Sequence, residues 1–407
     1  MSSRTSSGRA RTVTVEQERA LAALRESLVA YDYSTDGLRR LLGISSPDDV
    51  GLLNRAAALE RIRADTSPAA TLVRLLYLEA PQPKGDVERC FGAAGRDRLP
   101  EIDFLSRRGK LRTARLRVDV VDGSYVLADR RLSVPDAGAF GLPEGDMVYP
   151  PGGDTVLLAN ALPDEDGDVL DLCTGTGVQA LRTARTARRV VGIDIGRRAV
   201  ALARCNARLN GLENVVFRSG NLYAPVHGER FDLIVANPPF VAGPQRGPAY
   251  HSGGPFGDRV LKRIVTGLPM HLRPGGRALM ISHLALRHAE SVADRLRPGF
   301  SRGGRALALV LEEGSPVDLA AAQSVFALRD GLFEYGEEIR RWVAYLDRHR
   351  IERIVLLLLA FERRGRSGLE VVEAFQRSLP LPLSRPPQDL LRSWFDGRAH
   401  SSSDSTT

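Results

Sequence analysis

The stretch from Asp232 to Phe240 constrains the fold of this chain more than any other, because it joins an apolar run to two consecutive prolines. It reads Asp-Leu-Ile-Val-Ala-Asn-Pro-Pro-Phe. A short run of mostly branched apolar residues is typical of a fully buried strand, and the prolines remove the backbone donors that would continue it. The sequence therefore predicts a buried strand that ends in a stiff turn over Asn237–Phe240.

The residues of this turn offer a particular set of contacts. In open α/β sheets, ligands bind beyond the carboxyl ends of the strands. There the side-chain carbonyl of Asn237 and the backbone carbonyl of Pro238 would present two fixed acceptors, with the ring of Phe240 beside them. This set suits a planar NH2 group, whose hydrogens need two acceptors and whose flat face packs on a ring. The alternative is a plain loop in which the prolines only end the strand.

The chain after about residue 149 alternates between short apolar runs and longer amphipathic stretches, which indicates a parallel, doubly wound sheet. Six strands are expected, over Val169–Leu172, Val190–Ile193, Val215–Phe217, Leu233–Ala236, Ala278–Ser282 and Ala306–Leu311. The expected helices cover Gln179–Thr186, Ala199–Asn210, Asp258–Leu272, His288–Leu296 and Glu337–His349. Ile354–Phe361 adds a seventh strand, which can return antiparallel at the sheet edge. The expected fold class is α/β, with a seven-stranded, doubly wound, Rossmann-like sheet.

The N-terminal part has a helical pattern from Val15 to about Gly92, and Leu42-Gly43 marks the end of a short second helix. Further helices are expected over Asp48–Ala64 and Pro68–Ala80. Two alternating runs, Arg117–Val121 and Tyr125–Asp129, then flank Asp122-Gly123, which is a β-hairpin signal. We expect a mainly helical N-terminal domain with a hairpin, for which a winged-helix-like fold is one option.

The expected segments follow from these patterns and from the composition of the two ends. They are a disordered tail (1–14), the helical recognition domain with its hairpin (15–131), a linker (132–148), the α/β domain (149–364), a C-terminal extension (365–397) and a second disordered tail (398–407). Both tails are rich in Ser and poor in bulky apolar residues, which disfavours a packed core.

The charge of the chain, +8 with a sequence pI near 9.7, permits an acidic partner. Its clearest local expression is the block from Arg107 to Arg117, which holds six basic residues and no acid. Such a block is a candidate phosphate-contacting surface. An equally good interpretation is a hairpin edge that Lys and Arg protect against strand pairing.

Three cysteines, Cys90, Cys173 and Cys205, show neither C-x-x-C nor zinc-like spacing. The longest apolar run, Ile354–Phe361, is too short to cross a bilayer. We therefore expect a reduced, cytoplasmic protein that has no structural metal and no membrane partner.

A second candidate site lies on the segment Leu170–Ala180, which reads as a strand, a glycine-rich turn and the start of a helix. Gly175 and Gly177 let the backbone approach a ligand closely, and Asp194 ends the second strand, where a carboxylate can accept bonds from a ribose diol. A methyl-donor site, a nicotinamide site and a structural turn all fit this segment. The turn at Asn237 favours the methyl donor, because hydride transfer does not need two acceptors aimed at an amino group.

Taken together, Asp171-Leu-Cys-Thr-Gly-Thr-Gly177, Asp194 and Asn237-Pro-Pro-Phe240, in that order, resemble the class I S-adenosylmethionine-dependent N-methyltransferases. The groups most similar are the small-domain ribosomal RNA methyltransferases and the release-factor glutamine methyltransferases. The resemblance covers about Tyr149 to Phe361. It implies a Rossmann-like methyltransferase domain over 149–364, with S-adenosyl-L-methionine as the cofactor.

The resemblance also implies roles for single residues. Asp171, Gly175 and Gly177 would contact the methionine part of the cofactor, Asp194 would hold the ribose, and Asn221 would lie beside the adenine, where the family often has Asp. Thr155, with Asp154, would approach the cofactor from before the first strand. Cys173 replaces the usual small residue in the turn, and we expect its thiol to be packed and inert. Asn237, Pro238 and Phe240 would hold the acceptor.

The acceptor stays open. Phe240 is the commoner residue in small-domain RNA enzymes, so we expect an exocyclic amine of a nucleobase in RNA, with ribosomal RNA first. The alternatives are a protein glutamine amide of the release-factor type, a small molecule, and a catalytically silent binding module. The Pro/Gly-rich stretch Ala242–Gly257 is expected to act as a lid, and its His251 is either a proton acceptor or a solvated loop residue.

Overall fold

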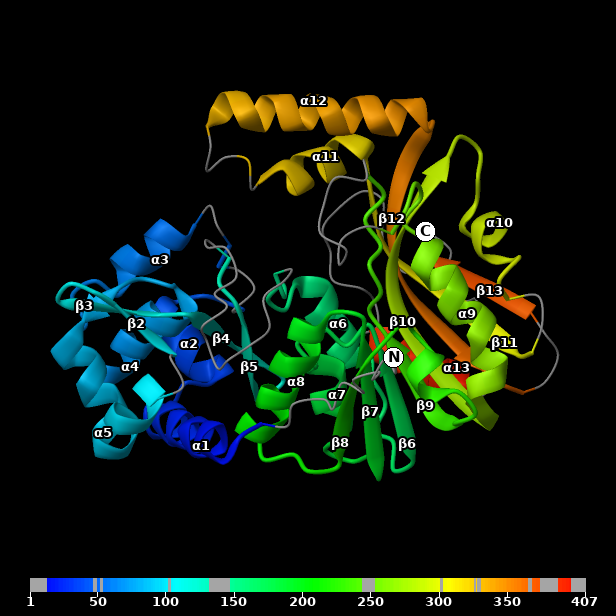
Figure 1. Cartoon of the computed structure of the whole chain (residues 1–407). Coiled ribbons are helices and arrows are strands. Elements are labelled where there is room, and N and C mark those ends of the chain that lie inside the picture. The colour runs from blue at the N-terminus through cyan, green and yellow to red at the C-terminus, as the bar shows by residue number, and fades with distance from the viewer. Residues whose placement is uncertain are drawn as a thin grey trace, which may run out of the picture. The chain divides into compact units, whose positions relative to one another are not determined.

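The structure, a computed structural model, describes residues 13–46, 50–51, 54–101, 104–131, 147–243, 253–300, 303–325, 327, 331–364, 368–373 and 387–396. Two compact units make up the chain, and Figure 1 labels their elements. The first comprises Met1–Val156, Thr174–Arg185 and Val191–Asn221, and the second comprises Leu157–Cys173, Thr186–Val190 and Leu222–Thr407. The glycine-rich turn therefore belongs to the first unit, and the Asn237 turn belongs to the second.

The first unit begins with the helices that the sequence predicts. They are α1 (Val15–Ala30), α2 (Thr35–Leu42), α3 (Arg55–Arg61), α4 (Pro68–Leu72) and α5 (Lys84–Glu101), with a π-helical turn (Val73–Tyr77) after α4. α1 and α5 pack side by side (Figure 1). α2 ends as expected, because Gly43 adopts a φ of 62° that closes the helix. The helix predicted over Asp48–Ala64 is shorter, since Gly51 disfavours helical backbone and only α3 forms in its described part.

Short strands complete the N-terminal part of this unit. β1 (Gln82–Pro83), β2 (Leu105–Arg108) and β3 (Leu111–Ala114) form a sheet of order β1-β3-β2. β4 (Leu116–Val121) and β5 (Ser124–Asp129) pair antiparallel. Their two-residue turn has a positive φ at both Asp122 (45°) and Gly123 (71°), which is the backbone of a type I′ turn. The predicted hairpin is thus confirmed.

The predicted basic block does not form one surface. Arg107 and Lys110 are exposed on the hairpin that β2 and β3 make. Arg117 is buried in β4 instead, where it pairs with Asp119 (2.8 Å) and Glu79 (3.1 Å). A buried guanidinium needs carboxylate partners, so Arg117 belongs to the interior and the basic surface is smaller than predicted.

The hydrophobic core of the first unit reaches beyond the N-terminal helices. Leu21 and Leu24 of α1 belong to the same cluster of buried residues as Leu202 and Leu209. The latter two lie on α8 (Arg197–Leu209), the helix that follows Asp194 in the chain. One helix of the α/β fold therefore shares a core with the N-terminal segment, which the sequence pattern does not reveal.

The predicted α/β sheet is present, with one more strand than expected. Its strands are β6 (Asp168–Leu172), β7 (Arg189–Asp194), β8 (Val215–Ser219), β9 (Phe231–Ala236), β10 (Leu272–Arg287), β11 (Arg305–Gly314), β12 (Ile351–Glu362) and β13 (Gly368–Glu373). Their order is β13-β11-β12-β10-β9-β6-β7-β8. The α/β fold class is confirmed, and β9 is the buried strand predicted to precede Asn237.

Two details of the sheet differ from the expectation. β12 is antiparallel, as anticipated, but it lies between β10 and β11 rather than at an edge. Its apolar run is buried on both faces, which suits an interior strand. β13 is the eighth strand, and it pairs parallel to β11 from within the stretch expected as a C-terminal extension.

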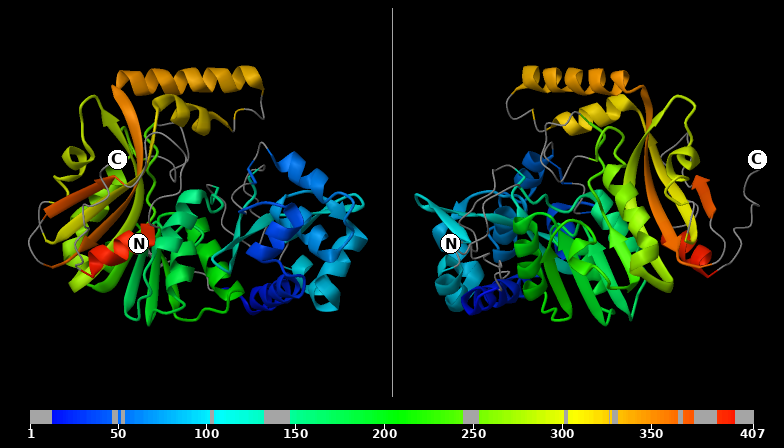
Figure 2. Two further views of the ribbon diagram at one scale, coloured as in Figure 1. Left: turned by 180° about the vertical axis from the view of Figure 1, so that it is seen from behind. Right: turned by 45° about the vertical axis from the view of Figure 1, so that its right-hand side comes forward.

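The helices α6 (Gly153–Ala161) and α7 (Val178–Thr183) flank the start of β6 and the glycine-rich turn in the sequence. The second unit has α9 (Arg259–His271), α10 (Val292–Leu296), α11 (Pro316–Ser324), α12 (Leu332–Arg348) and α13 (Pro387–Phe395). α11 and α13 were not predicted. α11 runs beside α12, as the views of Figure 2 agree. Within the described residues, no helix has the length and apolarity needed to cross a membrane.

Candidate active site

The glycine-rich turn lies in the first unit and depends on two left-handed glycines. Gly175 has a φ of 52° and Gly177 a φ of 91°. A Cβ at Gly177 would press on Ala203 (3.2 Å) and on the Phe217 ring (3.3 Å), so a larger residue would displace the turn. A Cβ at Gly175 would meet no heavy atom within 4 Å. The backbone at Gly175 therefore borders open space, where a ligand can approach it.

Asp194 fixes this turn from the end of β7. One carboxylate oxygen accepts the backbone N–H of Gly175 at 2.9 Å, and the other accepts that of Gly196 at 2.8 Å. Burial raises the pKa of Asp194, and the backbone N–H groups of Gly196, Gly175 and Ile195 partly offset this effect. Each oxygen has capacity for a second bond, which a hydroxyl of a ribose can donate.

Other predicted cofactor residues adjoin the same turn within the first unit. Gln179 of α7 donates from Nε2 to the carbonyl oxygen of Thr155 at 2.9 Å. Gly220 donates its N–H to the backbone oxygen of Asp194 at 2.9 Å, which places the exposed Asn221 one residue beyond that contact. Sequence reasoning missed Gln179. The sequence feature that could have indicated Gln179 is an amide residue directly after the glycine turn. In the structure this amide is buried, and its Oε1 accepts no hydrogen bond from a described residue.

The second unit brings Asp171 and Asn237 to the same end of two neighbouring strands. β6 and β9 pair in parallel, with Asp171 opposite Val235 and Leu172 opposite Ala236. Asp171 is fully buried, whereas Asn237 is half-buried just beyond the last pair. Asn237 thus begins its turn at the carboxyl edge of the sheet, where ligands bind in open α/β folds.

Cys173 occupies an unusual backbone conformation beside this edge. Its φ of 58° lies in the left-handed region, which side-chain-bearing residues rarely adopt and which often marks a functional turn. The thiol is half-buried. Burial raises the pKa of the Tyr223 hydroxyl, and the Cys173 thiol adds a smaller electrostatic effect in the same direction. Tyr223 itself donates to the carbonyl oxygen of Ile264 (2.8 Å) and stacks on His271.

Phe240 packs against a second ring. The centroids of Phe240 and His283 are 4.6 Å apart, with the planes tilted by 30°. Gly257, at a φ of 79°, lies so close that a Cβ there would collide with the carbonyl oxygen of Phe240. His283 lies in the extension of β10 beyond the residues that pair with β9.

The segment 253–257, which leads into α9, forms backbone hydrogen bonds to two other segments. Gly253 donates its N–H to the carbonyl oxygen of Val241 at 3.0 Å, and Ala285 donates to that of Phe256 at 3.2 Å. The Phe256 ring lies beneath two guanidinium groups, those of Arg287 (4.6 Å) and Arg295 (4.3 Å). His251 and most of the predicted lid, residues 244–252, lie outside the described residues.

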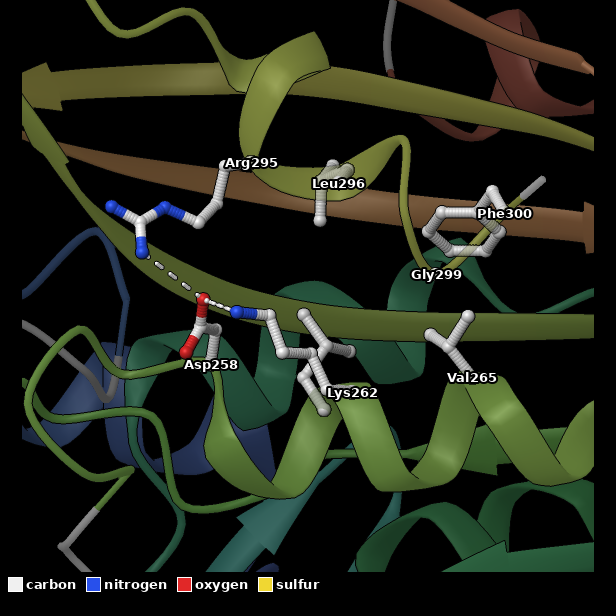
Figure 3. A pocket seen from close by; sticks show the side chains of 8 residues that line it. Asp258, Lys262, Val265, Arg295, Leu296, Gly299 and Phe300 are labelled. Carbon is white, nitrogen blue, oxygen red and sulfur yellow. Dashed lines mark hydrogen bonds and ion pairs between the residues drawn. The ribbon is translucent and has the colours of Figure 1, made fainter.

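A small cavity lies nearby between α9 and α10, as Figure 3 shows. Asp258 accepts ion pairs there from Lys262 (2.8 Å) and Arg295 (3.5 Å). The cavity has a volume of about 10 Å³, which admits at most one water molecule, so the cavity is not a substrate site. Among the described residues, no cluster of His, Cys, Asp and Glu has the arrangement of a metal site.

Two sequence families match parts of the chain. A domain family of unknown function matches residues 30–116, and the methyltransferase small domain family matches residues 152–298. A putative protein N5-glutamine methyltransferase of Methanocaldococcus jannaschii is 34% identical over 159 residues, which cover 37% of this chain and 79% of that protein. The chain belongs to the small-domain family of S-adenosylmethionine-dependent N-methyltransferases.

Two further relatives of this methyltransferase differ in their acceptors. A release factor glutamine methyltransferase of Xylella fastidiosa is 42% identical over 120 residues, covering 26% of this chain and 44% of that protein. The ribosomal RNA small subunit methyltransferase C of Escherichia coli is 31% identical over 140 residues, covering 34% and 37% respectively. The chain spans less than half the length of these two proteins, and they point to different acceptors.

S-adenosylmethionine is the cofactor of this family, and the residues present in the methyltransferase fit it. The backbone at Gly175 borders open space that a Cβ would partly fill, so glycine leaves this space to the ligand. Asp194 holds an acceptor at the end of β7, and Asn221 offers both a donor and an acceptor. The predicted cofactor contacts of the first unit therefore have the chemistry that an adenosyl ligand needs.

Proposed function

We propose that this protein transfers a methyl group from S-adenosylmethionine to the NH2 of a planar conjugated group, and that the acceptor is an exocyclic amine of a nucleobase in RNA. The observation that carries the proposal is the place of Asn237-Pro-Pro-Phe240 at the carboxyl end of β9, beside the buried Asp171 of β6. Family membership supports the reaction class. Asp171, Cys173, Gly175, Gly177, Asp194, Asn221 and Thr155 are proposed to line the cofactor, and Asn237, Pro238 and Phe240 the acceptor.

The chain's own groups orient the acceptor. The bound cofactor supplies an activated sulfonium methyl group. Asn237, through its side-chain oxygen, and Pro238, through its backbone carbonyl, accept the two N–H groups of the acceptor, which fixes the direction of the nitrogen lone pair. The same two acceptors stabilise positive charge as it develops on that nitrogen. The half-buried Phe240 ring covers one flat face of the acceptor.

Two observations favour a nucleobase. The rings of Phe240 and His283 lie in contact with a tilt of 30°, and base stacking on an aromatic side chain contributes about 1–3 kcal/mol. The exposed Arg107, Arg108 and Lys110 of the β2–β3 hairpin carry positive charge that an RNA backbone can neutralise. Binding to RNA should then weaken steeply as salt rises.

The second candidate is a protein glutamine amide. The relative in Methanocaldococcus jannaschii, covered over 79% of its length, is named as a glutamine methyltransferase. An amide has the same planar NH2, so the Asn237 turn accepts it equally well.

Transfer of a labelled methyl group from the donor separates these candidates. We expect label in ribosomal RNA and none in release factors or in peptides that contain Gly-Gly-Gln. Label in release factors or in the Gly-Gly-Gln peptides, with none in RNA, would move the assignment to the glutamine amide. Absence of donor binding at about 1 mM, a generous ceiling for a working site, would leave a silent binding module.

His283 is expected to position Phe240 for the acceptor. Replacing His283 with Ala removes the ring behind Phe240, and we expect KM for the acceptor to rise about 3–10-fold with a smaller change in kcat, given the usual strength of an aromatic pair. His283→Phe keeps a planar ring and should restore KM. Steady-state kinetics at saturating donor measures both variants. Equal KM values for wild type and His283→Ala would remove this role.

A further inference from the structure

We propose that Asn206 is a positioning residue that ties the β4–β5 hairpin to the Gly175–Gly177 turn, so that the affinity for the cofactor depends on this link. The inference rests on the proposed role of that turn as a cofactor contact. All the groups involved belong to the first unit. It makes the hairpin, which precedes the α/β fold in the chain, part of the cofactor-binding apparatus.

Asn206 joins two backbone segments through one amide. Its Oδ1 accepts the N–H of Leu127 at 2.8 Å, and its Nδ2 donates to the carbonyl oxygen of the same residue at 3.0 Å. The same Nδ2 donates to the carbonyl oxygen of Thr176 at 2.9 Å. Asn206 is fully buried, so no water can replace these bonds. Thr176 stands between the two left-handed glycines of the turn.

Asn210, the C-cap residue of α8 four positions after Asn206, repeats half of this pattern. Its Oδ1 accepts the N–H of Tyr125 at 2.9 Å and its Nδ2 donates to the carbonyl oxygen of Tyr125 at 2.7 Å. The spacing of four residues puts both amides on one side of α8 and its C-cap, where they bind the β5 backbone as a neighbouring strand would. The Nδ2 of Asn210 also donates to the carbonyl oxygen of Asn206 at 2.8 Å, whereas its bonds to Tyr125 involve the hairpin and not the glycine turn.

Charged contacts hold the rest of the hairpin to the helices that flank the turn. Asp129, at the end of β5, pairs with Arg198 of α8 at 2.9 Å, and both residues are almost fully buried. Asp122, in the hairpin turn, pairs with Arg182 of α7 (3.2 Å) and with Arg185 (2.9 Å). The hairpin is therefore attached at its turn, middle and end. Asn206 is the attachment that reaches the glycine turn itself.

The consequence for the turn follows from its geometry. Gly175 and Gly177 hold a conformation that is entropically costly, because glycine loses more backbone freedom than any other residue. If the buried carbonyl of Thr176 lost the Asn206 donor, the turn would tend to rearrange so that this carbonyl finds a new partner. A rearranged turn would misplace the Gly175 backbone that Asp194 orders. Cofactor affinity should then fall while the reaction of bound cofactor changes little.

The test compares Asn206→Ala with its matched control Asn210→Ala in the full chain. Each variant loses an amide that bonds to the backbone of one β5 residue, and Asn210→Ala also loses a bond to the carbonyl oxygen of Asn206. Only Asn206→Ala loses the bond to Thr176. Isothermal titration with S-adenosylhomocysteine is expected to show Kd raised about 10-fold for Asn206→Ala and less than about 2-fold for Asn210→Ala. The KM for the methyl acceptor should stay unchanged in both. Equal Kd values for the two variants would overturn the inference.

A second measurement needs no substitution and covers the case in which Asn206→Ala does not fold. Hydrogen exchange of the wild-type protein with and without S-adenosylhomocysteine reports on the amide of Leu127. Because coupling is reciprocal, the ligand should slow exchange at Leu127 more than at Tyr125. Protection confined to residues 174–196 would refute the link. Absence of any ligand binding by the wild type would instead refute the proposed cofactor site.

Discussion

Replacing Asn237 with Ala is expected to lower kcat for methyl transfer about 100–1000-fold, the usual cost of removing one preorganised polar group from a reacting centre. The side-chain oxygen of Asn237 is the acceptor that orients the NH2, and alanine leaves that hydrogen without a partner. The affinity for the cofactor should remain within about twofold. Label transfer under single-turnover conditions measures kcat, and titration with S-adenosylhomocysteine measures affinity.

The matched control for this substitution is Asn214→Ala. Asn214 is also half-buried, and its Nδ2 donates to the carbonyl oxygen of Ala184 at 2.8 Å, but it is not among the proposed site residues. We expect kcat of the control to equal that of the wild type. Unimpaired transfer by Asn237→Ala would sink the proposed acceptor role, whereas a loss in both variants would indicate a general effect on the fold.

The parts of the fold that sequence predicted well are those in which local chemistry is decisive. Gly43 ends α2 because its φ of 62° suits glycine, and Asp122-Gly123 specifies a type I′ hairpin turn. The apolar run before Asn237 specifies a buried strand, which is β9. In each case a few adjacent residues carry the full signal, so tertiary context does not override it.

Long-range pairing set the limits of prediction. The apolar run of β12 indicates burial on two faces, but nothing in it selects β10 and β11 as neighbours. β13 lies beyond the resemblance and is too short to stand out. The basic residue Arg117 reads as surface until its partners Asp119 and Glu79 are known, and Glu79 is 38 residues away.

The sequence allowed prediction of the residues that would contact the ligands, but not of the residues that hold them in place. Gly175, Gly177 and Asn237 follow a strand and Asp194 ends one, and that position alone makes them candidates. Asn206, in contrast, is an amide within an amphipathic helix, and its partners Leu127 and Thr176 are 79 and 30 residues away. The roles of Gln179 and His283 likewise depend on contacts made by other segments.

Replacing Asp194 with Asn is expected to raise the Kd for S-adenosylhomocysteine about 10–100-fold, because hydroxyl donors lose a charged acceptor worth about 1.5–3 kcal/mol. Burial raises the pKa of Asp194, and ribose binding uses the ionised form. Wild-type affinity should therefore fall as pH decreases through this raised pKa, and the variant should lack that dependence. Titration calorimetry between neutral and mildly acidic pH measures both effects.

Asp168→Asn is a control for these measurements, because Asp168 contributes to stability and is not among the proposed cofactor contacts. Burial alone would raise the pKa of Asp168, but bonds from Arg273 (2.9 Å) and Arg188 (3.1 Å) lower it. Its contribution to stability is thus present at neutral pH and lost as pH falls, so Asp168→Asn should lower Tm at pH 7 without changing Kd. The pKa of Asp194 is raised instead, so its ionised form costs stability at neutral pH. Asp194→Asn also places an NH2 group against one of the two backbone N–H groups that the carboxylate accepts, so Tm should fall in this variant too, and Kd is the measurement that separates the two variants. A Kd for Asp194→Asn equal to that of the wild type would show that this carboxylate serves only the turn.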